Sequence, residues 1–180
     1  MCVKMNLPNK LTVLRVILIV PFVGLMMIET PMCQLGAALV FGLASVTDWL
    51  DGWYARKHHL VTDFGKLMDP MADKLLVMAA LIGLVAQGRA PWLCAMVLLG
   101  REFVISGFRL VAASKGVVIA ADTLGKYKTA SQMVGLGLML GGGWWAALTV
   151  PGEILLWLSV VLSVVSCAQY IFKNREVVGE

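Results

Sequence analysis

Charged residues are scarce in this chain of 180 residues, where Asp, Glu, Lys and Arg together make up 14%. A soluble domain has about 25% charged and about 45–50% apolar residues, whereas this chain is 59% apolar with a mean hydropathy of +0.84. Residues 129–152 and 154–172 contain no charge at all, and roughly 20 apolar residues suffice for a helix to cross a bilayer. The composition excludes an ordinary water-soluble domain and predicts a polytopic membrane protein.

Cysteine and histidine are also scarce, with four and two residues, and no CxxC pair occurs. This excludes the common cysteine-based zinc and redox motifs. Most of the cysteines are expected to be small buried apolar residues, with a disulfide between Cys33 and Cys94 as an open alternative. His58 and His59 are adjacent in a basic stretch, where contact with headgroups or solvent is expected. The first apolar run lacks an A-x-A cleavage motif after it, so we expect a retained span.

Hydropathy and turn residues predict one all-α polytopic domain, residues 1–180, with six transmembrane helices. The expected spans are 11–28, 35–55, 68–87, 91–114, 127–148 and 153–172. One basic residue, Arg89, falls on one side of the membrane, and ten fall on the other. The ten are Lys4, Lys10, Arg56, Lys57, Lys66, Lys115, Lys126, Lys128, Lys173 and Arg175. Because Lys and Arg accumulate in cytoplasmic loops, we expect both termini in the cytoplasm. This asymmetry accounts for the net charge of +4 without nucleic acid as a partner.

The turns on the side opposite the termini are expected at 29–34, 88–91 and 150–153. The fifth span is rich in small residues, spaced four apart at Ser131 and Gly135 and again at Gly137 and Gly141. Small residues at this spacing let helices approach closely. Tight helix packing is therefore expected there rather than ligand binding.

Four aspartates crowd the connection between the second and third spans, in the stretch "DWLDGWYARKHHLVTDFGKLMDPMAD". Since a helix turns about 100° per residue, Asp48 and Asp51 lie within about 60° of each other. Asp69 and Asp73 are four residues apart and share one face of the next helix. The short connection makes the two helices antiparallel neighbours, so both carboxylate pairs can meet.

Four converging carboxylates carry a charge of −4, which two divalent cations would cancel. Hard oxygen ligands favour Mg²⁺ or Mn²⁺, and paired metal ions stabilise displacement at phosphorus. Alternatively, the aspartates are solvated and pair with nearby lysine and arginine; this is the expectation for Asp63, which we place in the loop. A divalent-cation transporter is a further alternative, because intramembrane aspartates can mark ion paths. It would be expected to show repeated halves, which the sequence lacks.

The spacing Asp48-x2-Asp51-Gly52-x2-Ala55-Arg56-x8-Gly65-x3-Asp69-x3-Asp73 resembles the signature of the CDP-alcohol phosphotransferases at every fixed position. The resemblance implies a six-helix membrane fold, a homodimer and a polar cavity open to the cytoplasm. It also implies two divalent ions, Mg²⁺ or Mn²⁺. Four carboxylates would hold them: Asp48, Asp51, Asp69 and Asp73.

The resemblance also assigns roles within the signature. Asp51 would bind only the first ion and Asp73 only the second, with Asp48 and Asp69 shared. Asp73 would also be the general base. Three small residues would leave room for the cytidine: Gly52, Ala55 and Gly65. Arg56 would contact the nucleotide phosphates, for which a planar guanidinium is well suited.

Outside the signature, "NLPNKLTVLRV", "REFVISGFRL" and "GKYKTASQM" resemble the bacterial phosphatidylglycerophosphate synthases. The resemblance implies an enzyme of the bacterial inner membrane that uses CDP-diacylglycerol and sn-glycerol 3-phosphate. Inositol phosphate, serine or a choline-type alcohol remains an alternative acceptor, and an inactive CDP-lipid-binding relative is another possibility.

Four basic residues are candidates for binding the acceptor phosphate: Arg101, Arg109, Lys126 and Lys128. Arg101 lies ten residues past Pro91, about 15 Å into the bilayer at 1.5 Å per residue, where a charge is costly unless it faces a polar cavity. Arg109 is about 80° further around the same helix. Alternatively, Arg101 pairs with a carboxylate such as Glu102, and Lys128 anchors the interface. Thr12 and Arg15 are further candidates, although an interfacial helix explains them equally well.

Overall fold

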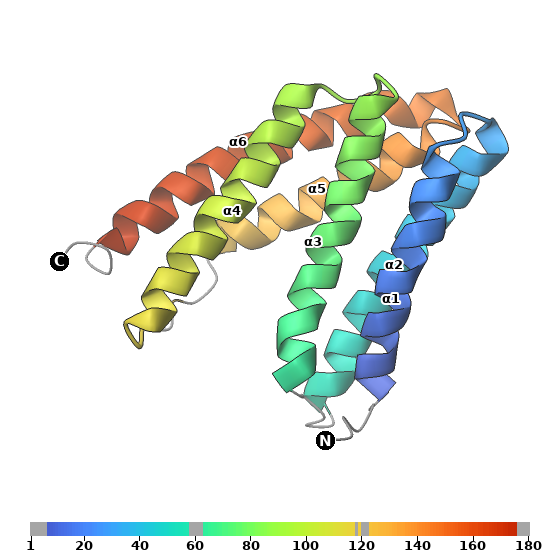
Figure 1. Ribbon diagram of the computed structural model, residues 1–180. Helices are drawn as coiled ribbons and strands as arrows, with labels where there is room; N and C mark the ends of the chain where they lie inside the picture. Colours follow the sequence, from blue (N-terminus) through green and yellow to red (C-terminus); the bar gives the residue numbers. More distant parts are fainter. Residues whose placement is uncertain (1–6, 58–62, 118, 120–122, 176–180) are drawn as a thin grey trace.

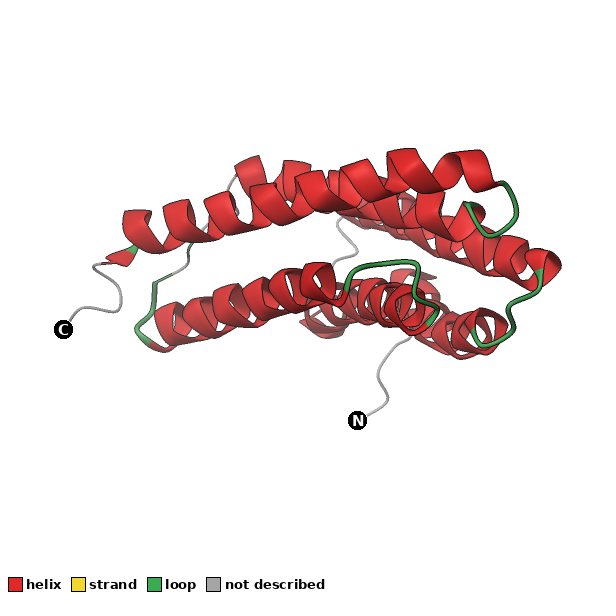
Figure 2. Ribbon diagram, turned by 90° about the horizontal axis from the view of Figure 1, so that it is seen from above, coloured by secondary structure: helices red, strands yellow, loops and turns green. Residues whose placement is uncertain are grey.

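The computed structural model describes residues 7–57, 63–117, 119 and 123–175, and within 7–11, 48–57 and 63–70 it describes the backbone only. Every regular element in these ranges is helical, as predicted. The elements are α1 (Leu7–Met26), α2 (Pro31–Lys57), α3 (Asp63–Ala86), α4 (Trp92–Ser114), α5 (Thr123–Gly141), the 3-10 helix η1 (Ala146–Leu148) and α6 (Thr149–Lys173). Figure 2 shows these helices joined by loops.

The second and third helices begin earlier than the sequence predicted. Pro31 is the first residue of α2, a position where the fixed backbone angle of proline suits a helix and its missing N–H removes no hydrogen bond. Asp63, expected in the loop, is instead the first residue of α3. His58 and His59 lie outside the described residues.

The boundary between the last two helices was predicted wrongly. The expected fifth span reached residue 148, whereas α5 ends at Gly141 and η1 follows after a turn. Three consecutive glycines at 141–143 disfavour helix, since each is about 1 kcal/mol worse than alanine in a helix interior. The expected turn at 150–153 lies inside α6. Pro151 is tolerated there because first-turn N–H groups have no partner within the helix.

The helices form two adjoining groups (Figure 1). In one group α1 packs against both α2 and α3, and in the other α6 packs against both α5 and α4. Contacts of α5 with α2 and α3, and of α3 with α4, join the groups. The α1–α2, α3–α4 and α5–α6 turns lie at one end of the molecule, which we call the turn end. The C-terminal part of α2 and the N-terminal part of α3, which carry the aspartate signature, lie away from it.

One buried core cluster contains side chains from all six α-helices. Phe22 of α1 and Phe41 of α2 are both almost fully buried, and their ring centroids are 6.1 Å apart. Leu81 and Leu98 belong to the same buried cluster, as does Leu136 of α5. Burying a side chain of this size contributes about 1.5–3 kcal/mol. The core therefore fixes the helices that carry the candidate site.

Glycines bring α5 and α6 close together, as expected from the small residues of the fifth span. A Cβ on Gly135 would lie 3.1 Å from both the carbonyl oxygen of Gly152 and the amide nitrogen of Leu156. A Cβ on Gly141 would lie 3.1 Å from Leu148 Cδ1. Gly137, however, has no atom within 4 Å of the same position, so its expected role in close packing was wrong.

Arg89 ties the turn end together. Its Nη1 donates to Gln34 Oε1 at 2.8 Å and Gln87 Oε1 at 3.2 Å, and its Nη2 donates to the backbone carbonyl of Met139. Gln87 Nε2 in turn donates to the carbonyl of Met26 at 2.6 Å. Burial lowers the pKa of the Arg89 guanidinium from its ordinary value. This cluster joins the ends of α1, α2, α3 and α5 where turns leave backbone groups to be satisfied.

Apolar side chains cover much of the outer surface. Val20, Leu43, Met96, Leu110 and Phe172 are each at least 64% exposed, and large exposed apolar areas mark contacts with membranes or partners. Among the described residues, one stretch, 146–173, is long and apolar enough to cross a membrane, and residues 12–26 and 31–47 form shorter apolar helices. The two cysteines of the alternative disulfide, Cys33 and Cys94, are both free thiols.

Candidate active site

Asp73 projects from the first half of α3 and is paired with α1. Its Oδ1 accepts a hydrogen bond from Arg15 Nη1 at 3.1 Å. The Arg15 side chain is 1% exposed, whereas that of Asp73 is 39% exposed. Thr12, one helical turn before Arg15, is also buried. The sequence left the role of Arg15 open, and the structure brings this cation directly to the predicted general base.

The other three signature aspartates are placed by their backbones. Asp48 and Asp51 lie in the last three turns of α2, and Asp69 lies one turn before Asp73 in α3. Their side chains are outside the described set, as are those of the four predicted nucleotide-binding residues, Gly52, Ala55, Arg56 and Gly65. No group of three metal-binding side chains occurs among the described residues, of which Asp73 is the one member of the signature quartet.

The four signature aspartates fit a divalent-cation site. All four signature residues carry carboxylates, which prefer hard cations. Asp73, the one described, keeps a partly exposed carboxylate and already has a positive group, Arg15, against one oxygen. A cationic partner of this carboxylate within the fold is Arg15.

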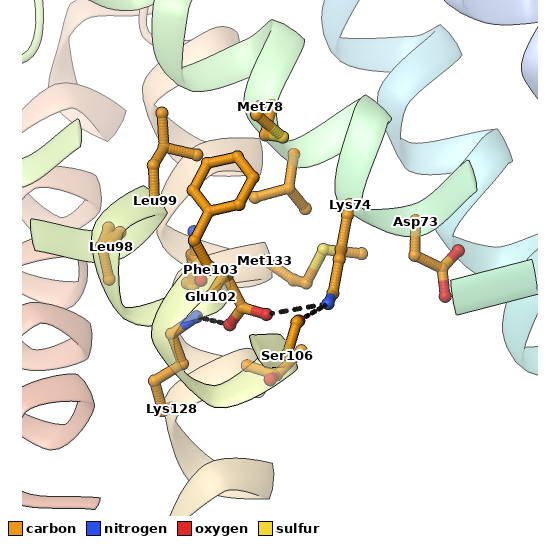
Figure 3. Close-up of a pocket in the computed structure, with 13 residues that line it drawn as sticks. Asp73, Lys74, Met78, Leu98, Leu99, Glu102, Phe103, Ser106, Lys128 and Met133 are labelled. Carbon is orange, nitrogen blue, oxygen red and sulfur yellow. Dashed lines mark hydrogen bonds and ion pairs between the residues drawn. The ribbon is translucent and has the colours of Figure 1, made fainter. Parts of the chain in front are cut away.

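A cavity of about 490 Å³ lies between α3, α4 and α5 (Figure 3). Asp73, Lys74, Glu102 and Lys128 line it together with Ser106. Its remaining wall is mainly apolar, formed by Val77, Met78, Leu98, Leu99, Phe103 and Met133. In Figure 3, Lys74 points toward Glu102, whereas the neighbouring Asp73 points away from it. The cavity therefore joins a charged cluster to an apolar wall, a combination suited to an amphipathic substrate.

The charged cluster is centred on Glu102 of α4. Its Oε1 accepts from Lys128 Nζ at 2.8 Å and from Arg101 Nη1 at 3.1 Å. Its Oε2 is 3.6 Å from Lys74 Nζ, which also donates to Ser106 Oγ at 2.6 Å. The Lys128 side chain is only 2% exposed. The pairing of Arg101 with Glu102, one of the two alternatives left open, is therefore observed.

A second cavity, of about 520 Å³, adjoins the first and shares Glu102 and Thr129 with it. Three of the four predicted acceptor residues line it: Arg101, Arg109 and Lys126. Arg109 Nε donates to Tyr170 Oη at 3.2 Å, and its guanidinium carbon lies 5.6 Å from the centroid of that ring. Arg101 Nη2 donates to Ser166 Oγ at 3.1 Å. The fourth predicted residue, Lys128, lines the first cavity instead.

Sequence reasoning missed Lys74 and Tyr170, and it considered Glu102 only as a partner for Arg101. The signal for Glu102 was present: an acidic residue beside an arginine in the middle of an apolar span must have a partner. Lys74 adjoins the signature, but its partners come from α4, 28 and 32 residues further along the chain. No local pattern could reveal that contact.

The chain is similar to known proteins over most of its length. The family model for CDP-alcohol phosphatidyltransferase matches residues 5–165. A Bacillus subtilis (strain 168) protein named CDP-diacylglycerol–glycerol-3-phosphate 3-phosphatidyltransferase is 43% identical, and the alignment covers 95% of this chain and 96% of that protein. Proteins with the same name from Rickettsia bellii (strain RML369-C) and Escherichia coli (strain K12) are 39% and 36% identical. These alignments cover 92% and 96% of this chain, and 93% and 96% of the relatives.

Proposed function

Because the chain belongs to the CDP-alcohol phosphatidyltransferase family, we propose that it transfers the phosphatidyl group of CDP-diacylglycerol to sn-glycerol 3-phosphate. The products are phosphatidylglycerophosphate and CMP. The names of its relatives support both substrates. The observation that carries the proposal is structural: basic side chains line a cavity that adjoins the one reached by Asp73. A dianionic acceptor requires such basic groups, whereas a neutral alcohol does not.

The four signature aspartates would hold two divalent cations, Mg²⁺ or Mn²⁺. Asp48, Asp51 and Asp69 would bind the first ion, and Asp73 would join Asp48 and Asp69 at the second. When bound, the ions would stabilise charge that develops on the oxygens at phosphorus. The helical positions of the aspartates and the hard-oxygen chemistry of the ligand set support this assignment.

Asp73 is the proposed general base. It accepts the proton of the glycerol 3-phosphate hydroxyl as that oxygen attacks the phosphorus bearing diacylglycerol. The bond from this phosphorus to the oxygen of the CMP phosphate breaks, and CMP leaves with the bonding electron pair. Arg15 holds one oxygen of Asp73, which orients the carboxylate for this role.

The remaining residues bind and orient the two substrates. Gly52, Ala55 and Gly65 would leave room for the cytidine, and Arg56 would contact the nucleotide phosphates. The acceptor phosphate would bind in the second cavity, on Arg101, Arg109 and Lys126. Lys128 is buried against Glu102 and would support the acceptor site through this ion pair rather than by direct contact with the phosphate. Cationic groups at fixed positions stabilise phosphate most effectively because they need no reorganisation during reaction.

The proposed setting is the bacterial inner membrane, with six transmembrane helices, the aspartate signature and both termini facing the cytoplasm, and a homodimer as the assembly. The exposed apolar side chains on the helices support lipid contact. The positive-inside asymmetry supports the orientation. With this orientation, both water-soluble substances, glycerol 3-phosphate and CMP, would enter and leave from the cytoplasm.

An acceptor panel tests the proposal. Purified protein receives CDP-diacylglycerol, Mg²⁺ and one acceptor at a time: labelled glycerol 3-phosphate, inositol phosphate, serine or choline. CMP release and labelled lipid should require glycerol 3-phosphate. Transfer to another alcohol would reject this acceptor, and CMP release with none would reject the transferase chemistry. Uptake of metal into sealed vesicles without any nucleotide lipid would instead favour the transporter alternative.

A further inference from the structure

Glu102 occupies the meeting point of three helices. It lies on α4, and the three cations around it come from α3 (Lys74), α4 (Arg101) and α5 (Lys128). Figure 3 shows its carboxylate between the two lysine ammonium groups. Both oxygens are used, with Oε1 toward Arg101 and Lys128 and Oε2 toward Lys74. One carboxylate therefore organises cations from three separate elements.

The charge balance of this cluster favours anion binding. Three cations around one carboxylate leave two positive charges in excess. Lys128 is nearly inaccessible at 2% exposure, so its charge is neutralised locally by Glu102. A buried charge without a partner costs several kcal/mol, which makes Glu102 a requirement for Lys128 to remain in place. The excess positive charge faces the cavities through Lys74, which is 42% exposed, and Arg101, which is 14% exposed.

Glu102 also connects the two cavities, since it lines both. On the second cavity it fixes Arg101 through Nη1, while Ser166 fixes the same guanidinium through Nη2. On the first it holds Lys74, the residue next to Asp73. Neighbouring helical residues point about 100° apart. The backbone of α3 therefore directs Lys74 toward α4 and Asp73 toward Arg15 of α1.

We propose that Glu102 is a positioning residue that fixes Arg101 for the phosphate of an alcohol phosphate monoester. The inference rests on the proposed function and names the group that sets its acceptor specificity. Glu102 itself contacts neither the phosphate nor the reacting atoms. It keeps one guanidinium at the phosphate end of the acceptor.

The test is steady-state kinetics with each substrate varied in turn. Glu102→Gln keeps the size of the side chain and removes its charge. Its KM for glycerol 3-phosphate should rise on the order of tenfold, with kcat and the KM for CDP-diacylglycerol changed by less than about threefold. Glu102→Asp should recover part of the loss. Glu153→Gln is the matched control, because Glu153 is exposed near the start of α6, at the turn end.

A double variant separates positioning from general loss of structure. Glu102→Gln leaves Lys128 unpaired and can prevent folding, whereas Glu102→Gln with Lys128→Met removes both charges of the pair together. The double variant should fold. Its KM for glycerol 3-phosphate should rise about as much as that of Glu102→Gln, and not by the product of the changes that Glu102→Gln and Lys128→Met cause singly. If Glu102→Gln is not recovered folded, a selective rise in this KM for the double variant supports the inference.

Two results would overturn the inference. One is an unchanged KM for glycerol 3-phosphate in folded Glu102→Gln or in the double variant. The other is an equal loss in kcat and in both KM values, which would indicate a structural role alone. Neither result touches the proposed function, which fails only if the unmodified protein transfers no phosphatidyl group to glycerol 3-phosphate.

Discussion

The close backbone approach between α5 and α6 at Gly152 gives a sharp test of the packing. A Cβ added to Gly152 would lie 2.7 Å from Met139 Cγ, 2.8 Å from Met139 N and 3.0 Å from the carbonyl oxygen of Gly135. Met139 N and Gly135 O belong to the backbone of α5 and cannot rotate away. The substitution Gly152→Ala must therefore push α5 and α6 apart.

The expected size of the effect follows from two opposing contributions. Alanine is favoured over glycine in a helix by about 1 kcal/mol. Forcing an extra carbon into a closely packed contact costs about 1–3 kcal/mol. With two backbone atoms at or below 3.0 Å, we place Gly152→Ala at the upper end of that cost, for a net loss of about 1–2 kcal/mol. Gly137→Ala meets no atom within 4 Å and should be neutral or stabilising by up to about 1 kcal/mol.

The assay is thermal unfolding of the two variants and the unmodified protein in the same detergent. Gly152→Ala should unfold at a lower temperature than the unmodified protein, and Gly137→Ala at the same or a higher one. Gly135→Ala, with contacts of 3.1 Å, should fall between them. If Gly152→Ala were as stable as Gly137→Ala, the close approach of α5 to α6 would be refuted.

Three further predictions concern the site and the turn end. Asp73→Asn should reduce kcat, measured by CMP release, by at least about a hundredfold and should retain CDP-diacylglycerol binding, measured by lipid binding. Asp63→Asn, which removes a carboxylate outside the signature, should leave both quantities near normal. Full activity of Asp73→Asn would exclude Asp73 as the base. Arg15→Met removes the hydrogen bond to Asp73 and should lower kcat on the order of tenfold, with little change in the KM for glycerol 3-phosphate; a selective change in that KM would place Arg15 at the acceptor instead. Arg89→Met should lower the unfolding temperature, because it leaves buried amide and carbonyl groups unpaired at a cost of about 1–3 kcal/mol each. It should not alter the KM for either substrate, measured below that temperature. Altered KM values would show that the turn end is coupled to the site.

Most of the helical architecture was predictable because long apolar runs and turn residues give strong local signals. The prediction failed between α5 and α6, where an uncharged run hid the turn. Hydropathy does not distinguish a continuous helix from one broken at Gly142 and Gly143, since both keep apolar side chains away from water. Helix propensity carries that information, and three adjacent glycines should have outweighed the apolar pattern.

The candidate site was predictable where its spacing is local and unpredictable where its partners are distant. Asp69 and Asp73 share a helix face by their spacing alone, and Arg101 was expected to face a cavity because of its depth. The pairing of Asp73 with Arg15 spans 58 residues, and it depends on how α1 packs against α3. Lys128 illustrates the same limit: its basic character suggested phosphate binding, but the fold buries it against Glu102.

The Arg89 cluster has a mechanical consequence. It fastens helix ends at the face opposite the aspartate signature, so this end acts as a pivot. A helix of 24 residues such as α3 is about 36 Å long at 1.5 Å per residue. A tilt of less than about 2° around the pivot then moves its far end by a full ångström over that length. Small rotations about the turn end would thus displace the signature end of a helix by ångströms, without breaking the bonds that hold the opposite end.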